Sequence, residues 1–185
     1  MNKSKKEKGN ERLLQSRLPD IKHIAIFFSI TIGGIILDLW SKSAIFARLD
    51  EGQTLPIIDG IVQFIKTSNP GAAFGIAHGQ RTLLVSVSLI ALLVILGIFL
   101  FGKIRDTSMT VILAMLEAGV TGNLYDRIFN NGQVRDFIDV VYWPGKHWPA
   151  FNVADSLLCI SVALLIITGH LFTPRSDQKH DPQQK

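Results

Sequence analysis

The residues of this chain that could do chemistry are acids at or beside the ends of long apolar segments. Two carboxylates that come close together do not both ionise easily, so one keeps its proton. The ionised partner can then take a proton from water, while the protonated partner polarises a peptide carbonyl and later protonates the leaving nitrogen. This chemistry needs neither a nucleophilic side chain nor a metal. The candidate acids are Asp38, Asp126, Asp136, Asp139 and Asp155.

Several of these acids also have a structural interpretation. Asp38 precedes Lys42 by four residues, a spacing that suits an ion pair on one face of a helix. Asn152 is a good N-cap residue, and Asp155 three positions later would favour the positive end of the helix dipole. Taken alone, this capping role is the more common explanation of Asp155. The residues by themselves leave both roles open.

The other acids lie around the loop between the last two apolar segments. Asp126 directly precedes Arg127, and the two side chains could form a pair at the membrane interface. In the sequence VRDFID at 134–139, strand-like alternation would place Asp136 and Ile138 on one face. A solvated loop acid is the simpler interpretation of Asp136. Spacing does not choose between the acids of this loop.

Other chemistries lack their usual residue patterns in the sequence. The histidines and the cysteine form no cluster with metal-ligand spacing, and there is no Gly-Lys-Ser phosphate loop and no serine elbow motif. The single cysteine, Cys159, lies inside an apolar run and is predicted to be a buried, inert thiol. We therefore expect neither a metal nor a cofactor.

Long apolar segments indicate a membrane protein. Of the 185 residues, 48% are hydrophobic, and the run at 82–101 holds no charge. About 20 such residues are enough to cross a bilayer core, and a soluble core helix is not apolar on all sides over that length. We predict a membrane all-α fold with four transmembrane helices at about 24–46, 82–101, 108–124 and 153–172.

The first predicted span has a second interpretation. Its continuous apolar part, 24–37, follows a basic segment, which is also the arrangement of a cleavable signal peptide. Apolar residues resume after Asp38 and Lys42, and no small-x-small cleavage site follows cleanly, so an uncleaved span is favoured. In the third span, Glu117 should face protein or water, because a charge is costly in lipid.

The basic residues predict the orientation in the membrane. Of the 19 Lys and Arg, most lie in the two termini and in the turn at 103–106. Cytoplasmic segments carry an excess of Lys and Arg. Both termini are therefore predicted to be cytoplasmic, and the loops at 47–81 and 125–152 extracytoplasmic.

Three parts of the chain follow from this arrangement. Residues 1–23 form a basic cytoplasmic segment, 24–172 the four-span membrane domain and 173–185 a polar cytoplasmic tail. No aromatic residue is interleaved with the bases of the first segment, which argues against a nucleic-acid partner and favours membrane lipids.

The loop at 47–81 is predicted to contain a short strand. Its segment 60–68 reads GIVQFIKTS, and this alternation suits a strand with one face on the bilayer or the bundle. Asn-Pro-Gly at 69–71 ends the strand, and Gly75 marks a further turn. Residues 72–74 lie between these turns and are expected to touch the membrane surface.

Five motifs occur in the order in which one known family has them: LDLWSK at 37–42, NPGAAFG at 69–75, GNLYDR at 122–127, VRDFID at 134–139 and FNVADS at 151–156. With them the chain resembles lipoprotein signal peptidase, also called signal peptidase II, over about residues 21–171. The resemblance implies an intramembrane aspartic endopeptidase of the bacterial inner (plasma) membrane. Such an enzyme removes the signal peptide from diacylglyceryl-modified prolipoproteins, cutting before the lipidated cysteine. A small extracytoplasmic β-cradle, matching 47–81, and inhibition by the cyclic peptide globomycin are also implied.

The same resemblance implies roles for particular residues. The family's catalytic dyad maps onto Asp136 and Asp155, which decides against Asp126 and Asp139. Arg135 stands before Asp136 where the family commonly has an apolar residue, and its charge, if near, would favour ionisation of the dyad. Further motif positions, many of which line or support the site in the family, are Asp38, Lys42, Asn69, Gly71, Asn123, Asp126, Arg127, Asn152 and Ala154.

Two other classes of function compete with the peptidase. A small proton-coupled membrane carrier would use Asp38, Lys42 and Glu117 as a relay, but it needs polar groups at mid-bilayer and a route to both sides. Only Glu117 lies well inside a predicted span, whereas the other polar residues gather at one face. A non-enzymatic assembly factor would need no paired acids and would keep working after Asp→Asn substitutions.

Overall fold

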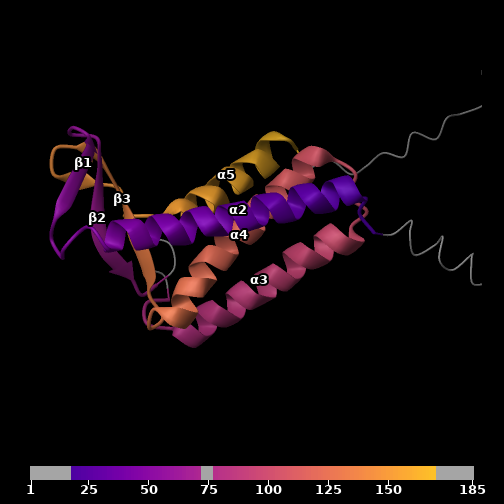
Figure 1. The fold of residues 1–185 in the computed structure, drawn as a ribbon, viewed down its shortest axis with the longest axis horizontal. Coiled ribbons are helices and arrows are strands. Elements are labelled where there is room, and N and C mark those ends of the chain that lie inside the picture. The colour runs from indigo at the N-terminus through magenta and orange to yellow at the C-terminus, as the bar shows by residue number, and fades with distance from the viewer. Residues whose placement is uncertain (1–17, 72–76, 170–185) are drawn as a thin grey trace, which may run out of the picture.

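The computed structural model describes residues 18–71 and 77–169. Within them, four helices and a four-stranded sheet follow one another as shown in Figure 1. The helices are α2 (Ile21–Phe46), α3 (Arg81–Phe101), α4 (Thr107–Phe129) and α5 (Val153–Ile167). The strands are β1 (Thr54–Ile58), β2 (Val62–Asn69), β3 (Val134–Trp143) and β4 (Lys146–His147). Most of the basic segment, the turn at 72–75 and the polar tail lie outside the described residues.

Each predicted span coincides with a helix, but the bounds differ. Helix α2 begins at Ile21 because Asp20 caps it, with its carboxylate accepting a hydrogen bond from the His23 amide at 2.9 Å. Helix α4 continues beyond the predicted end to Phe129, so that Asp126 and Arg127 belong to the helix. The described part of α5 ends at Ile167.

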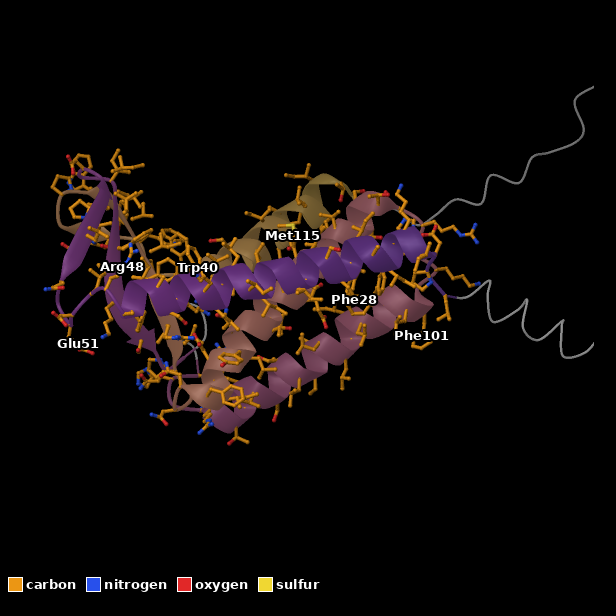
Figure 2. The ribbon with its side chains drawn as sticks, in the orientation of Figure 1. Phe28, Trp40, Arg48, Glu51, Phe101 and Met115 are labelled. Carbon is orange, nitrogen blue, oxygen red and sulfur yellow. The ribbon has the colours of Figure 1, made fainter. Side chains whose placement is uncertain are left out.

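Two of the described helices, α2 and α3, are long and apolar enough to cross a membrane. Helix α5 is apolar but has 15 residues, and α4 has 23 residues that include Glu117. Large apolar side chains point away from the bundle, and Figure 2 labels Phe28, Trp40 and Phe101 on its outer surface. An exposed apolar surface of this extent suits contact with lipid. The chain therefore has the architecture of a membrane protein, with apolar helices and a small antiparallel sheet.

Helix α4 is the centre of the bundle and packs against α2, α3 and α5. Small residues allow these close approaches. A Cβ added to Gly34 of α2 would lie 2.8 Å from Ala118 Cβ, and one added to Gly119 would lie 2.7 Å from the Ala154 carbonyl oxygen. Between α2 and α3, the rings of Phe27 and Phe99 stack with centroids 4.0 Å apart.

The sheet is antiparallel with the order β1-β2-β3-β4. The predicted strand at 60–68 is confirmed as β2, although it is half-buried along most of its length rather than alternating. Strands β1 and β4 were not predicted. The implied assignment of the β-cradle to 47–81 was incomplete, because β3 comes from the segment between α4 and α5. Pairing of β2 with β3 brings the two segments together, with Thr67 opposite Asp136.

The sheet lies at one end of the bundle, as Figure 1 shows. The start of α2, the end of α3 and the start of α4 lie together at the opposite end. Helix α5 starts at the sheet end, directly after the segment that follows β4. Residues from β3, α4 and α5 can therefore meet beneath the sheet.

Candidate active site

A cavity of about 940 Å³ lies between the sheet and the ends of α4 and α5. Asp136 of β3 and Asp155 of α5 both line it, together with Asn69, Asn123 and Arg127. The fold thus brings the two dyad candidates to one site. The remaining lining residues are Thr67, Ser68, Pro70, Gly71, Val134, Trp148, Pro149, Ala150, Phe151, Ser156, Leu158, Cys159 and Ile160.

Asp136 is buried on β3, with only 2% of its surface exposed. Asn152 Nδ2 donates a hydrogen bond to its Oδ1 at 2.7 Å. Burial, assisted by the charge of Asp155, raises the pKa of Asp136 to about 7, against smaller lowering effects from Asn152 and Asn69 hydrogen bonds. The raised pKa favours the protonated form of Asp136 at pH values where an ordinary aspartate is ionised. The interpretation of Asp136 as a solvated loop acid is wrong.

Asp155 combines the capping role with a place in the cavity. The backbone N–H of Asp155 donates to Asn152 Oδ1 at 2.9 Å, and Asp155 Oδ2 accepts from the backbone N–H of Asn152 at 3.2 Å. These two bonds form a capping box at the start of α5. Asp155 Oδ1 accepts a hydrogen bond from Asn123 Nδ2 at 2.8 Å. The helix cap thus holds the carboxylate in place without occupying all of its acceptor sites.

Asn123 and Asn152 connect the two aspartates. Asn152 Nδ2 lies 2.7 Å from Asp136 Oδ1 and 3.2 Å from Asn123 Oδ1. Lys42 Nζ also donates to Asn123 Oδ1, at 3.3 Å. Because the oxygen of Asn123 faces two donors, its amide nitrogen must face Asp155. The two asparagines therefore fix the orientation of both carboxylates.

A buried charge cluster lies next to these asparagines. Lys42, which is fully buried, has its Nζ 2.7 Å from Asp38 Oδ2 and 3.2 Å from Asp126 Oδ2. Arg135 binds Asp126 Oδ1 through Nη2 at 2.7 Å and Nε at 3.0 Å, and its backbone N–H donates to Oδ2 at 3.0 Å. Two acids and two bases cancel, which is how buried charges are tolerated. The predicted Asp38–Lys42 pair is confirmed.

The same contacts correct two interpretations. Asp126 does not pair with Arg127, because adjacent residues on a helix do not face each other. Arg135 is directed to Asp126 rather than to the dyad, since neighbouring strand residues point to opposite faces. Its charge is therefore not among the interactions that lower the pKa of Asp136.

Asp38, Gly122 and Ala154 form a close contact between α2, α4 and α5. Asp38 Oδ1 accepts a hydrogen bond from the Ala154 amide at 2.9 Å. A Cβ on Gly122 would lie 2.5 Å from Asp38 Oδ2 and 3.2 Å from Ala154 Cβ. Only glycine leaves room for this arrangement, which places the start of α5, and with it Asp155, against α4.

Arg127 joins the cavity to the Asn-Pro-Gly turn. Its Nη2 donates to the Gly71 carbonyl at 3.3 Å, and Asn69 Oδ1 accepts from the Gly71 amide at 2.9 Å. Arg127 is buried near enough to Asp136 and Asp155 to be attracted by their charges. A cation at this position compensates part of the negative charge of the cavity.

Asp139 is buried on β3 but does not line the cavity. Its Oδ2 accepts from Gln63 Nε2 at 2.6 Å and lies 2.8 Å from His147 Nδ1. Sequence reasoning missed both partners, because Gln63 is brought opposite Asp139 by the pairing of β2 with β3, and His147 is brought near by the pairing of β3 with β4. Cys159 was also wrongly predicted: it is exposed and lines the cavity.

Within the described residues, no group of three or more His, Cys, Asp or Glu side chains could hold a metal ion. Apolar helices, a small antiparallel sheet and two acids facing one cavity make this a membrane protein with an acid pair at its candidate site. The chain matches the family described as "Signal peptidase (SPase) II" over residues 30–171. It belongs to the signal peptidase II family, so the resemblance drawn from its motifs is confirmed.

Individual relatives agree with this family. The chain is 40% identical over 147 residues to the lipoprotein signal peptidase of Geobacter sulfurreducens, covering 77% of this chain and 89% of the relative. It is 39% identical to that of Syntrophus aciditrophicus, covering 80% of this chain and 94% of the relative. A bacterial membrane enzyme solved by the in meso method at 2.3 Å resolution superposes with a TM-score of 0.73 at 29% identity, covering 90% of this chain and 98% of that one.

Proposed function

We propose that this chain removes the signal peptide from diacylglyceryl-modified prolipoproteins, cutting before the lipidated cysteine, with Asp136 and Asp155 as its catalytic dyad. The observation that carries the proposal is the raised pKa of Asp136, about 7, beside a second carboxylate in the same cavity. A perturbed carboxyl in a cleft, next to another acid, suits acid–base chemistry near neutral pH. Family membership supplies the substrate class.

The proposed reaction gives each aspartate one proton-transfer role per step. Asp155 takes a proton from water as the water oxygen bonds to the scissile carbonyl carbon, and Asp136 gives its proton to the carbonyl oxygen. In the gem-diol that results, Asp136 takes back a hydroxyl proton while Asp155 protonates the nitrogen. The C–N bond then breaks, and the carboxylic acid and the amine depart as products. The dyad is then back in its starting protonation state.

The supporting residues position rather than transfer protons in this proposal. Asn152 and Asn123 orient the two carboxylates through the bonds of 2.7 and 2.8 Å described above. Arg127 and Asn69 hold the backbone at Gly71, which forms part of the cavity wall. Hydrogen bonds of this kind tune the orientation and basicity of the groups they touch.

The walls of the cavity suit a lipidated substrate. One wall is formed by residues 148–151, and another by Leu158, Cys159 and Ile160 of α5. Since these positions of α5 are exposed or half-buried, acyl chains could reach the cavity from the side of the bundle while remaining in the lipid. A globomycin-type cyclic peptide would occupy the same space.

Four membrane crossings with both termini in the cytoplasm complete the proposal. The start of α2 and the α3–α4 turn lie at one end of the bundle, and the sheet lies at the other, as four crossings require. Reporter fusions after Arg105 and within 140–148 should report opposite sides of the inner membrane. An extracytoplasmic signal from the fusion after Arg105 would rule out this topology.

The carrier alternative is not favoured. Asp38 and Lys42 form part of a neutral cluster with Asp126 and Arg135 at the site, rather than a relay across the membrane. Glu117 has one buried oxygen without a hydrogen-bond partner. Within the part of the chain that the structure describes, no hydrogen bond or ion pair joins Glu117 to Asp38 or Lys42.

The direct test is cleavage of a synthetic diacylglyceryl-modified prolipoprotein by the purified full chain in detergent. We expect cleavage before the lipidated cysteine, none of the unlipidated peptide, and inhibition by globomycin. Asp155→Asn should abolish turnover, while Asp139→Asn, at a buried acid of β3 that does not line the cavity, should keep it. Equal cleavage of lipidated and unlipidated peptides would refute the substrate class, and full activity of Asp155→Asn would refute the dyad.

A further inference from the structure

A second cavity lies at the opposite end of the bundle, away from the acid pair. Its volume is about 260 Å³. It lies between the start of α2 and the α3–α4 turn, at the end of the molecule shown opposite the sheet in Figure 1. Its lining residues are Leu18, Pro19, Asp20, His23, Lys103, Ile104 and Arg105.

The lining of the cavity carries two cations, Lys103 and Arg105, against one acid, Asp20. Lys103 and Arg105 form no ion pair with any described residue. The carboxylate of Asp20 is already bound by His23, through Nδ1 at 2.7 Å and the backbone N–H at 2.9 Å. Asp106, next to the cavity, caps α4 by accepting from Ser108. Two cations are thus available to an anionic ligand.

His23 adds a buried polar atom without a partner. The residue is 6% exposed, and its Nε2 has no hydrogen-bond partner, whereas buried polar atoms are normally satisfied. Since Asp20 can only accept, His23 Nδ1 must carry the hydrogen of their contact. In the neutral ring, Nε2 is then an acceptor. A ligand that satisfies this site therefore offers a hydrogen-bond donor as well as negative charge.

Lys103 adds a second observation on the α3–α4 turn. Its φ is +52°, in the left-handed region that favours glycine. The backbone conformation does not explain a lysine at this position. A lysine here is explained if its side chain supplies a cation to the cavity that it lines.

The position of the cavity selects a lipid as the source of the ligand. Beside it lie Ile21, the first residue of α2, and Phe101, the last residue of α3, which are 80% and 70% exposed. Both helices are apolar enough to cross a membrane. Phospholipid headgroups lie at the ends of such helices, and basic pockets between helices bind anionic headgroups. Exposed apolar side chains next to the cavity would contact the acyl chains.

We propose that this cavity binds one anionic phospholipid, with its phosphate at Lys103 and Arg105 and a headgroup hydroxyl at His23 Nε2. Phosphatidylglycerol has both groups. The site is separate from the acid pair, so the proposal does not depend on the proposed cleavage reaction. It requires only that this end of the bundle lies at a membrane surface.

The experiment is a titration of the full chain in detergent with phosphatidylglycerol or phosphatidylcholine, with bound lipid counted by native mass spectrometry. We expect one phosphatidylglycerol to bind more tightly than phosphatidylcholine. The K103Q/R105Q variant should bind phosphatidylglycerol about 30-fold more weakly, because each basic residue near an anionic lipid contributes about fivefold. Its cleavage activity should be unchanged in phosphatidylcholine nanodiscs.

Two further variants separate a built site from general charge attraction. R48Q/K146Q removes two exposed charges at the sheet end and should change phosphatidylglycerol binding less than about twofold. His23→Phe removes Nε2 but leaves Lys103 and Arg105 in place, and it should still weaken binding several-fold. Equal losses in the two double variants, or no loss in His23→Phe, would overturn the proposed site. Displacement of the lipid by millimolar inorganic phosphate would overturn the assignment to a headgroup.

Discussion

Asp136→Asn should make the protein more stable at alkaline pH while it destroys activity. The substitution keeps the shape of the side chain and an oxygen that can accept the 2.7 Å hydrogen bond from Asn152. It removes the ionisable carboxyl, which burial and the charge of Asp155 hold at a pKa of about 7. The folded protein thus loses a charge that it accommodates poorly.

The magnitude follows from the difference between the two states of the chain. A carboxyl with a pKa of about 7 when folded and of about 3.8 when unfolded costs about 4 kcal/mol of stability once it is ionised in both states. Because the folded pKa is the higher one, the stabilising contribution is complete below pH 4 and is lost as the pH rises through 7. Asp136→Asn has no carboxyl at this position, so its stability does not fall for this reason as the pH rises. We expect the fall in Tm between pH 4 and 8 to be smaller by on the order of 10 °C in the variant.

The assay combines thermal unfolding in detergent across this pH range with cleavage of a lipidated prolipoprotein. Turnover by Asp136→Asn should fall by at least about a thousandfold, the usual size of an acid–base contribution. Asp139→Asn is the matched control, since Asp139 is 4% exposed on the same strand and its acceptor role toward Gln63 survives the change. A pH dependence of Tm in Asp136→Asn equal to that of the parent would refute the raised pKa. Turnover above a tenth of the parental rate would refute the catalytic role.

Three further predictions concern the pair and its supports. Cleavage should decline as the pH rises through about 7, because the pair then loses its shared proton, and a profile that still rises from pH 6 to 9 would contradict this. Asn152→Ser should keep the cap of α5, and so most of the Tm, yet lower kcat at least tenfold because the bond to Asp136 is lost; an unchanged kcat would make Asn152 merely structural. Gly122→Ala should lower both Tm and activity because its Cβ would clash with Asp38, whereas Gly33→Ala, with nothing within 4 Å, should leave both within error.

The helices could be predicted from sequence because long apolar runs need no partner to be recognised. The sheet was harder, because its edge strand depends on pairing. Strand β1 has five exposed residues, and Pro56 within it argues against a central strand. Only its pairing with β2 makes it a strand, and Pro56 is tolerated because β1 forms the edge. The short β4 depends in the same way on β3.

For the candidate site, the motifs identified residues but not their contacts. Spacing predicted the Asp38–Lys42 pair, because it joins neighbouring turns of one helix. It did not predict that Arg135 would bind Asp126, because that contact depends on where β3 begins relative to the end of α4. The capping role of Asp155 was the more common explanation, and it is present; the structure adds that a capping carboxylate can face a cavity as well.

The neutral charge cluster explains how residues of α2 influence an acid on α5 that they do not touch. Lys42 Nζ donates hydrogen bonds to Asp38 and to the oxygen of Asn123, and it forms an ion pair with Asp126. The hydrogen bond from Lys42 fixes the amide of Asn123, whose nitrogen then holds Asp155 at 2.8 Å. The cluster thus orients the dyad, and the charge of Lys42 lowers the pKa of Asp136 only in part, so that burial and the charge of Asp155 still raise it.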